Sequence, residues 1–550
     1  MAPEGSVVHE AGPRELERLF HQGVLSRRQL LQGLVTIGLS AASIEILFGS
    51  ETGTVEAQVP RPRYLVLIVL DGFRPDYLQL AEMPAYRALA AAGTVYERAW
   101  VGQLESETPV GHATLSTGAL PRNHGIIGFE WRDPASLLEV KDGWEQGAAL
   151  GQVGRDLAAH HVTSIPEAVK RANPGAVVVS LSSEKVYAAD AMSARAADYV
   201  LYHQFSGNRL SPAALPGQSP DVDFFAGKHL TLPLPLAHFT DWDYLSSQLA
   251  LAALARYRPE VLMVNLPGSD VYGHKYGGPN SPGIMTHVVA GQDRAIGRIV
   301  RAYQSAGIYD QTLFVVTADH AMVPNTHAVG PDQIGAAVRQ AGARVQFHTG
   351  GSGKYIYLQP PFRTRAKEVA QAVAKIPGVV AGYYRTASGD YVLAAGSIPA
   401  ELDAAYRGLI ATFTGPTAPD VVAPYRENTI GTTLPQLYGN HGGLSWGVQH
   451  VPLLLTGPGV RAGIRSHAPA RLVDVAPTVL RLLGLTWPGL DGLVLADALV
   501  DANAAEVAAQ RLLTRSLGLH QEALIERSLS DVAGDRQTHA APPPPISAQP

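Results

Sequence analysis

The 550-residue sequence contains no cysteine. This absence excludes disulfide bonds, thiolate metal sites and cysteine nucleophiles, including those of sulfatases that modify a cysteine. The chain also lacks a large excess of either charge, because its formal net charge at pH 7 is -5. It has no stripe of basic residues with interleaved aromatic side chains either, so nothing in it indicates nucleic-acid recognition.

Apolar residues, in contrast, are abundant, and at 46% of the chain they are sufficient for a large buried core. Apolar runs of strand length occur at residues 64–70, 176–181, 261–266, 312–317 and 451–455, with helical patterns between them, for example at 241–256 and 288–305. Strands that alternate with helices in this way are typical of a sheet covered on both faces. The sequence therefore predicts an α/β fold with a doubly wound, mostly parallel sheet.

One segment within this pattern has strands and a helix of its own. Residues 354–358 and 391–394 are predicted strands, and residues 363–375 are a predicted helix. We expect residues 326–431 to form an inserted α+β cap subdomain, and residues 62–325 and 432–525 to form the core. Residues 540–550 are Pro- and Ala-rich, and residues 530–550 are predicted to be a disordered tail.

The N-terminal residues 1–57 resemble a twin-arginine export signal. Arg27 and Arg28 precede a moderately apolar stretch, and small residues around Ala57 provide a plausible cleavage site. The alternative is a basic helix cap before a membrane anchor, since Glu45 interrupts the apolar stretch. We expect the twin-arginine export machinery to be a partner, and the protein to be periplasmic, extracellular or at the cell surface.

Carboxylates and imidazoles follow several of the apolar runs. The candidate metal ligands are Asp71, Asp270, His274, Asp319, His320 and, further along the chain, His441. In open α/β sheets, ligands bind in the crevice beyond the carboxyl ends of the strands, where such residues would meet. Mixed Asp and His sets suit zinc, although manganese and iron also bind to them.

Each of these residues also has an ordinary structural interpretation. Asp71 could close a turn before Gly72, Asp270 and His274 could pair on the surface, and His320 and His441 could be core histidines. All of these interpretations would have to hold together, which is far less plausible than a shared site. Two ligand trios, each with an open position, are what metal-assisted hydrolysis at phosphorus requires.

Thr108 is the candidate nucleophile. It precedes Pro109 at a predicted helix start, where a threonine is a natural N-cap and a proline fits the first helical position. A hydroxyl at this anion-binding end could attack phosphorus and form a covalent phosphothreonine. The alternative is an ordinary helix cap, but the neighbouring ligand candidates favour catalysis.

These segments together resemble the alkaline phosphatase superfamily, in particular its type I phosphodiesterase/nucleotide pyrophosphatase family. The matching motifs occur in the expected order from about residue 61 to about residue 499, and include Asp71-Gly72, Thr108-x-x-x-His112, Asp270-x-x-Gly273-His274, Ala318-Asp319-His320 and Asn440-His441-Gly442-Gly443. The resemblance implies an alkaline-phosphatase-like core with two zinc ions. It implies that Asp71, Thr108, Asp319 and His320 hold one zinc ion, and that Asp270, His274 and His441 hold the other.

Two positions concern the substrate. Phe129 replaces an asparagine whose amide helps many relatives to bind a phosphoryl oxygen, and its ring could instead pack against an ester or nucleoside group. Lys185 is placed in the sequence to reach over the site, as a basic residue does in phosphomonoesterases and phosphonate hydrolases of the superfamily. The alternative is a solvated lysine after a strand.

The leading hypothesis is an exported two-metal phosphoesterase that hydrolyses phosphodiester or pyrophosphate bonds of a small substrate. The alternative within the superfamily is a phosphomonoesterase (alkaline phosphatase) or a phosphonate hydrolase. A sulfatase is disfavoured, because its nucleophile motif is missing around Thr108. A metal-dependent binding protein is disfavoured because the nucleophile and all the ligands are present. The sequence gives no indication of an oligomeric state.

Overall fold

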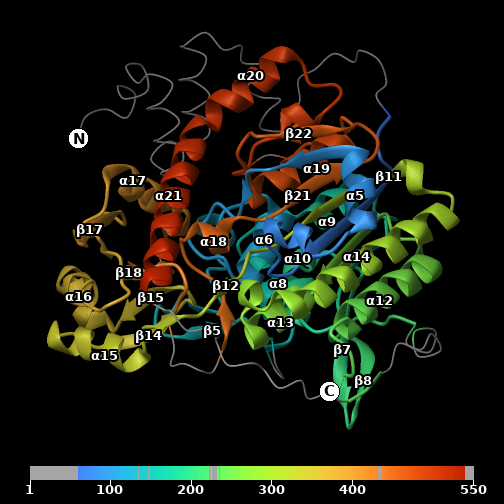
Figure 1. Ribbon diagram of the computed structural model, residues 1–550. Coiled ribbons are helices and arrows are strands. Elements are labelled where there is room, and N and C mark those ends of the chain that lie inside the picture. The colour runs from blue at the N-terminus through green and yellow to red at the C-terminus, as the bar shows by residue number, and fades with distance from the viewer. Residues whose placement is uncertain are drawn as a thin grey trace.

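The computed structural model describes residues 60–538, except 134, 146–148, 222–224, 226–231, 235, 416, 432–436 and 488. The predicted export signal therefore lies outside the described residues. A ten-stranded sheet runs through the larger part of the molecule (Figure 1). Its strands, in spatial order, are β22 (Ile464–Ser466), β2 (Gly93–Tyr96), β21 (Leu453–Thr456), β11 (Thr312–Thr317), β1 (Tyr64–Leu70), β10 (Val261–Leu266), β6 (Val178–Ser182), β7 (Tyr199–Ser206), β8 (Arg209–Ala214) and β9 (Leu232–Pro233).

The middle of this sheet is parallel. Strand β1 pairs in parallel with both β10 and β11, and β6 continues the parallel arrangement to β7. Every residue of β1, β10 and β11 is buried, as expected for strands that are covered on both faces. The mixed α/β fold with a large, mostly parallel central sheet confirms the predicted fold class.

The bounds of the three central strands agree with the apolar runs at residues 64–70, 261–266 and 312–317. The run at residues 451–455 also yields a strand, but β21 lies between β11 and β2 and is antiparallel to both. Helices α12 (Asp241–Tyr257) and α14 (Pro282–Ser305) pack against each other, and α12 also packs on β10. Helix α14 begins at residue 282, earlier than the predicted 288, because Pro282 fits the first turn of a helix.

A second sheet of five strands lies beside the first, at the left of Figure 1. We call it the small sheet. Its strands, in spatial order, are β14 (Val345–Thr349), β15 (Gly353–Leu358), β18 (Val421–Pro424), β16 (Gly382–Arg385) and β17 (Tyr391–Ala395). Helix α16 (Ala366–Val373) packs on it through a separate apolar cluster that includes Ile356, Val369 and Val421. The small sheet thus has its own core, within the residues for which the sequence predicts an insertion.

The last helix in the described part of the chain is α21 (Arg515–Thr538), which packs on α17 (Ala400–Ile410) (Figure 1). This helix extends past residue 530, where the sequence predicted a disordered tail to begin. Asp531 explains the extension, because its carboxylate accepts a hydrogen bond from the backbone N–H of Glu427 at 3.1 Å and pairs with Arg527 at 2.9 Å. Residues 539–550 lie outside the described part of the chain.

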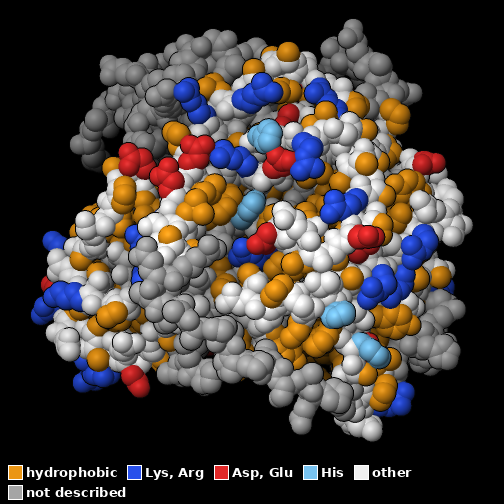
Figure 2. Space-filling model, viewed as in Figure 1, with side chains coloured by type: hydrophobic (Ala, Val, Ile, Leu, Met, Phe, Trp, Pro, Cys, Tyr) orange, Lys and Arg blue, Asp and Glu red, His pale blue; other side chains and the backbone are white. Residues whose placement is uncertain are grey.

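The surface carries charges of both signs. On the face in Figure 2, Lys and Arg side chains alternate with acidic ones, and hydrophobic side chains are scattered between them. Of the helices in the described part of the chain, none combines the length and the apolar character needed to cross a membrane.

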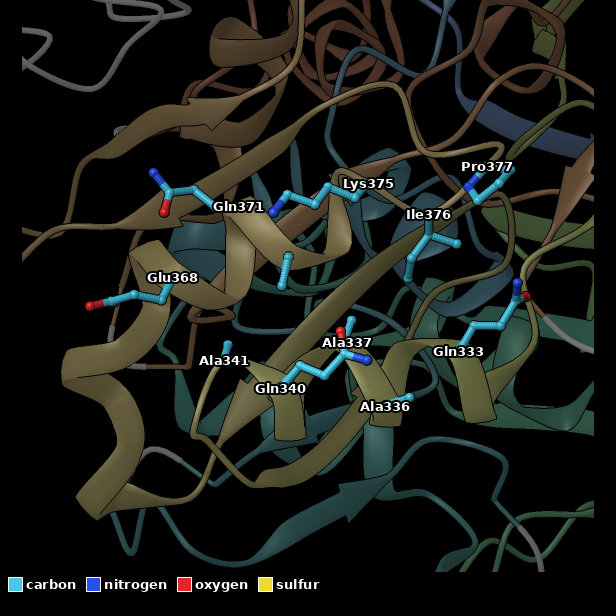
Figure 3. A pocket seen from close by; sticks show the side chains of 11 residues that line it. Gln333, Ala336, Ala337, Gln340, Ala341, Glu368, Gln371, Lys375, Ile376 and Pro377 are labelled. Carbon is cyan, nitrogen blue, oxygen red and sulfur yellow. The ribbon is translucent and has the colours of Figure 1, made fainter.

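A groove of about 480 Å³ lies between α15 (Pro331–Gln340) and α16 (Figure 3). Its lining is mixed: Gln333, Gln340, Glu368, Gln371 and Lys375 supply the polar side chains, and the remaining lining residues are alanines, Ile376 and Pro377. No candidate ligand or nucleophile from the sequence lines it. The candidate catalytic residues therefore lie elsewhere, at the large sheet.

Candidate active site

The ends of three adjacent strands bring the predicted ligands together. Asp71 directly follows β1, and Asp319 and His320 follow β11, which is paired with β1. Asp270 lies in the first turn of α13 (Gly268–Tyr276), the helix that follows β10, and His274 is one turn further along. This is the crevice beyond the carboxyl ends of parallel strands where α/β folds bind their ligands.

Asp71, Asp319 and His320 form the first trio, in which one ligand atom of each residue lies within 4.8 Å of the others. His320 Nε2 is 3.5 Å from Asp71 Oδ1 and 3.3 Å from Asp319 Oδ2. The other ring nitrogen, Nδ1, lies 3.1 Å from the carbonyl oxygen of Ala321, to which it can donate. That hydrogen bond leaves a lone pair on Nε2 facing the two carboxylates, as in a metal-ligating histidine.

Asp270, His274 and His441 form the second trio. The two Nε2 atoms are 3.1 Å apart, and each lies within 3.4 Å of Asp270 Oδ1. Each imidazole turns Nδ1 toward a backbone carbonyl oxygen: His274 toward Gly439 at 2.9 Å, and His441 toward Ser106 at 3.0 Å. Both rings are therefore oriented with Nε2 available as a ligand.

The donor set of both trios suits divalent metal ions. Two buried carboxylate oxygens, Asp270 Oδ1 and Asp319 Oδ2, make no well-aligned hydrogen bond, although imidazole nitrogens of His274 and His112 lie 3.3 Å from them. Orphaned buried acceptors are costly, and a cation between the converging ligands would satisfy them. Carboxylate oxygens combined with imidazole nitrogens are the ligands that zinc prefers.

The protonation preferences of two of the three histidines in the trios agree with this interpretation, whereas for His274 burial would lower the pKa but Asp270 raises it. Burial lowers the pKa of His320, and burial together with His320 lowers that of His441 well below its usual value, so both rings favour the neutral form that binds metals. Burial would raise the pKa of Asp319, but the neighbouring His320 and His112 lower it. Burial and the nearby Asp319 raise the pKa of Asp71 to about 7.

Thr108 lies beside the first trio. Its Oγ1 is 3.2 Å from His320 Nε2 and 3.4 Å from Asp71 Oδ1, and the residue is completely buried. Thr108 is the first residue of α6 (Thr108–Thr117), and Glu107 occupies the N-cap position that the sequence predicted for the threonine. The difference has a clear cause: the hydroxyl points to the trio, so it makes no capping bond to the helix backbone.

Lys185 reaches into the same space from the end of β6. Its Nζ donates to Asp71 Oδ1 at 2.9 Å and to Asp270 Oδ2, and lies 3.4 Å from Thr108 Oγ1. The side chain is only 5% exposed, so it is not a solvated surface lysine. Burial would lower the pKa of its ammonium group, but Asp270 and Asp71 raise it well above the usual value.

Two further residues of the site were not singled out from the sequence. His112 lies one turn after Thr108, with Nδ1 2.8 Å from the carbonyl oxygen of Thr108 and Nε2 3.1 Å from Asn265 Oδ1. Asn265 Nδ2 in turn donates to Asp71 Oδ2 at 3.0 Å. His112 is part of the Thr108 motif, and Asn265 is the only amide in the apolar run 261–266, so each had a signal in the sequence.

Phe129 belongs to an aromatic wall formed with Trp144 and Tyr187. The rings of Phe129 and Trp144 are stacked, with centroids 3.9 Å apart, and Tyr187 meets both edge-on. The backbone N–H of Phe129 donates to Glu107 Oε2 at 3.0 Å, which ties the wall to the residue before the nucleophile. Phe129 is 8% exposed and Trp144 is 45% exposed, so Trp144 presents most of the accessible ring surface.

The chain belongs to the family described as type I phosphodiesterase / nucleotide pyrophosphatase, because the model of this family matches residues 65–443. The match spans both trios and Thr108. It also covers the small sheet and confirms the family to which the sequence motifs pointed.

Individual curated proteins are similar to parts of this chain. The chain is 24% identical over 268 residues to an uncharacterized pyrophosphatase/phosphodiesterase of Schizosaccharomyces pombe, covering 48% of this chain and 45% of that protein. It is 24% identical over 263 residues to a bis(5'-adenosyl)-triphosphatase of Bos taurus, covering 48% of each chain. An alkaline phosphatase, PhoK of a Sphingomonas species, is 29% identical over 150 residues, which are 25% of this chain and 26% of that protein. The chain therefore spans about half the length of the first two of these relatives.

Solved structures share the fold. Alkaline phosphatase PafA superposes with a TM-score of 0.65 at 19% identity, over 80% of this chain and 100% of that chain. The murine ectonucleotide pyrophosphatase / phosphodiesterase 5 superposes with a TM-score of 0.54 at 18% identity, over 78% of this chain and 97% of that chain. An inactive variant of the murine protein has been solved with AMP.

Proposed function

We propose that the protein is a metal-dependent phosphoesterase that hydrolyses phosphodiester or pyrophosphate bonds of small substrates through a covalent phosphothreonine. One observation carries this proposal: the Thr108 hydroxyl lies within 3.4 Å of His320 Nε2, Asp71 Oδ1 and Lys185 Nζ. A buried hydroxyl at a helix start, surrounded by ligand candidates and a cation, is placed for nucleophilic attack rather than for capping.

The metal ions of this proposal are two zinc ions, with manganese or iron as alternatives that the same ligands accept. Asp71, Asp319 and His320, with the Thr108 hydroxyl, would hold one ion, and Asp270, His274 and His441 would hold the other. When bound, such ions lower the pKa of the nucleophile and stabilise the charge that develops on phosphorus and on the leaving oxygen.

The residues of the chain then have distinct roles. The Thr108 hydroxyl releases its proton to solvent, and its oxygen forms a bond to phosphorus while the bond from phosphorus to the leaving oxygen breaks; the leaving oxygen takes up a proton from solvent. A water oxygen subsequently bonds to phosphorus, the bond to Thr108 breaks, and a proton from that water regenerates the hydroxyl. His112 holds the Thr108 carbonyl oxygen, and therefore the start of α6, against the first trio throughout both steps. Lys185 binds a phosphoryl oxygen with its ammonium group.

The aromatic wall supports a preference for an ester group with a flat ring. Phe129 brings no side-chain donor to the phosphoryl group, a loss of the kind that typically costs about 2.7–4 kcal/mol at a developing oxyanion. Lys185, with its ammonium group beside Thr108, is the donor that can replace it. The ring of Phe129 stacks on that of Trp144, and in this proposal the more exposed Trp144 contacts the ester group.

Hydrolysis of phosphomonoesters or phosphonates is the second candidate function, and Lys185 is the observation that favours it. A buried ammonium group next to the nucleophile compensates a second negative charge on phosphorus, which monoesters have and diesters lack. The two candidates therefore differ in how much of the substrate binding energy comes from Lys185 and how much comes from the aromatic wall.

The ratio of kcat/KM for bis-p-nitrophenyl phosphate to that for p-nitrophenyl phosphate distinguishes these candidates. We expect the ratio to exceed one for zinc-loaded protein, and chelation to abolish turnover of both substrates. A ratio below one that rises in Lys185→Met would instead establish the monoesterase. If neither ester is turned over by zinc-loaded protein, and both are bound, the protein is a metal-dependent binding protein and the proposed hydrolysis is wrong.

We further propose that the protein is exported by the twin-arginine pathway, and that residues 326–431 are an insertion that caps the site. The paired Arg27 and Arg28 support export. Replacing both by lysine should retain the full-length chain in the cytoplasm, as fractionation would detect. Export that persists in this variant would contradict the twin-arginine assignment.

A further inference from the structure

His441 differs from the other ligands because little regular secondary structure fixes its position. It follows β20 (Gly439–Asn440), a strand of two residues that, among the described strands, pairs only with the equally short β12 (Val323–Pro324). Its imidazole is held through Nδ1 by the carbonyl oxygen of Ser106. The backbone of His441 is therefore positioned by contacts with other segments of the chain.

Some of these contacts come from the small sheet. We name residues 350–353, with the sequence Gly-Gly-Ser-Gly, the glycine loop; they comprise the connection from β14 and Gly353, the first residue of β15. The backbone N–H of Ser352 donates to the carbonyl oxygen of His441 at 3.0 Å and to that of Gly442 at 2.8 Å. One amide of the loop thus fixes two successive peptide groups at the ligand.

The approach between the two backbones is too close for a side chain at Gly351. A Cβ atom built there would lie 2.1 Å from the carbonyl oxygen of His441 and 2.7 Å from Asn440 Nδ2. By contrast, a Cβ atom on Gly353, two residues further along, would find its nearest atoms at 3.7 Å, which is ordinary contact. The glycine at position 351 is therefore required by contact with the ligand segment, whereas the glycine at 353 is not.

Glu105 closes the other side of this arrangement. Its side chain is completely buried, and its Oε1 would lie 2.3 Å from a Cβ atom on Gly442. Glu105 directly precedes Ser106, whose carbonyl oxygen holds the imidazole of His441. The segment 441–442 is therefore enclosed between the glycine loop and the residues just before the nucleophile.

From these contacts we infer that the glycine loop is a positioning element of the second metal trio, so that the small sheet determines how tightly the second trio binds a divalent cation. The loop touches no ligand atom and acts through the backbone of His441. This inference rests on the proposed role of His441 as a metal ligand, and goes beyond it by assigning a metal-binding function to the small sheet. Groups that orient metal ligands typically change metal affinity about 10–100-fold.

The test compares Gly351→Ala with Gly353→Ala as the matched control in the same loop. Zinc binding to the full chain is titrated against a competing chelator in the absence of substrate. We expect Gly351→Ala to weaken one of two zinc sites by about tenfold or more. We expect Gly353→Ala to bind both ions like the unsubstituted protein. Two unchanged sites in Gly351→Ala, or equal weakening in both variants, would overturn the inference.

His441→Ala identifies which site is affected, and separates this inference from the proposed function. His441→Ala should lose the same ion that Gly351→Ala binds weakly. When both variants are loaded with cobalt, they should lose the same absorption bands, those of a cobalt ion bound by two imidazoles. If His441→Ala keeps two tight sites, the assignment of His441 as a ligand fails, and the inference fails with it. If His441→Ala loses an ion that Gly351→Ala retains, the inference alone fails.

A measurement on the unsubstituted protein covers the case in which Gly351→Ala does not fold. Hydrogen exchange of peptides that contain Ser352 is followed as the second equivalent of zinc is added. We expect the exchange of its amide to slow, because the metal fixes His441 and with it the carbonyl acceptor. Exchange that does not change with the second zinc ion would overturn the inference.

Discussion

The two trios use the same kinds of ligand but are built in different ways. The first trio, Asp71, Asp319 and His320, is completely buried and follows two long central strands that are paired with each other. The second takes two residues from α13, one of which, His274, has a side chain that is 23% exposed. Its third residue, His441, depends on contacts with a different sheet. We therefore expect the first trio to be rigid and the second to be the more easily disturbed.

Removing the proposed nucleophile tests whether turnover is lost while both trios still bind their metal ions. Thr108→Ala should reduce kcat by roughly three to six orders of magnitude, as removal of a nucleophile does elsewhere. The zinc content of the protein should remain at two ions, because three protein ligands stay at each site. Thr108→Ser is the matched control, since it restores a hydroxyl and should recover part of kcat. Turnover of Thr108→Ala within tenfold of the unsubstituted protein would exclude the phosphothreonine.

Substituting one ligand from each trio tests the comparison directly. Asp319→Asn should lose the first ion and also destabilise the fold, because His112 Nδ1 lies 3.3 Å from Asp319 Oδ2 in a fully buried pair. Breaking a buried pair in this way typically costs about 3–5 kcal/mol. His441→Ala should lose the second ion with a much smaller change in the melting temperature of the metal-free protein. Equal destabilisation by the two variants would contradict the difference that we draw between the trios.

The aromatic wall lies outside both trios, so changing it should affect substrate binding alone. Trp144→Ala should raise KM for an aryl phosphodiester by about tenfold, since stacking on a ring is typically worth about 1–3 kcal/mol. We expect kcat and zinc content to change little. Phe205→Ala is the control, because Phe205 is 72% exposed on β7 and lies in neither the wall nor a trio. A lower kcat with unchanged KM would show that the wall positions the reacting groups instead.

An effect on stability alone, and not on turnover, should come from Glu145, the buried acid that follows Trp144 in the sequence. Glu145 accepts hydrogen bonds from the backbone N–H groups of Val153 and Gly151, and burial together with Asp190 raises its pKa from 4.5 to about 10. The folded protein therefore keeps a proton that the unfolded chain releases. The stability that the protonated Glu145 carboxyl group contributes is complete below about pH 4.5 and is lost as the pH rises toward 10.

Glu145→Gln removes this titration. Its melting temperature should therefore fall less between pH 7 and pH 10 than that of the unsubstituted protein, as measured by thermal unfolding in matched buffers. The same slope in both proteins would show that Glu145 does not titrate in this range.

The sequence was most informative where local structure alone places a residue. Asp71, Asp270 and Asp319 each follow an apolar run, and the bounds of those strands were predicted correctly, because strands buried on both faces are continuously apolar. The antiparallel direction of β21 could not be predicted, since an apolar run does not encode the direction in which it pairs. The stacking of Trp144 on Phe129 and the contact of Ser352 with His441 are equally hidden, because both join segments that have no common pattern in the sequence.

The placement of His441 also has a consequence for the order of events during synthesis. Every ligand of the first trio is present in the chain once His320 has been made, and the strands that place Asp71 and Asp319 pair with each other directly. His441 is made only after the small sheet, and its backbone then takes the hydrogen bonds that the amide of Ser352 offers. On the proposed assignment of the ligands, the first trio would be complete on a partly made chain, whereas the second would be complete only when the small sheet has formed. Metal loading would then follow the order of the segments along the chain, with the more deeply buried trio first.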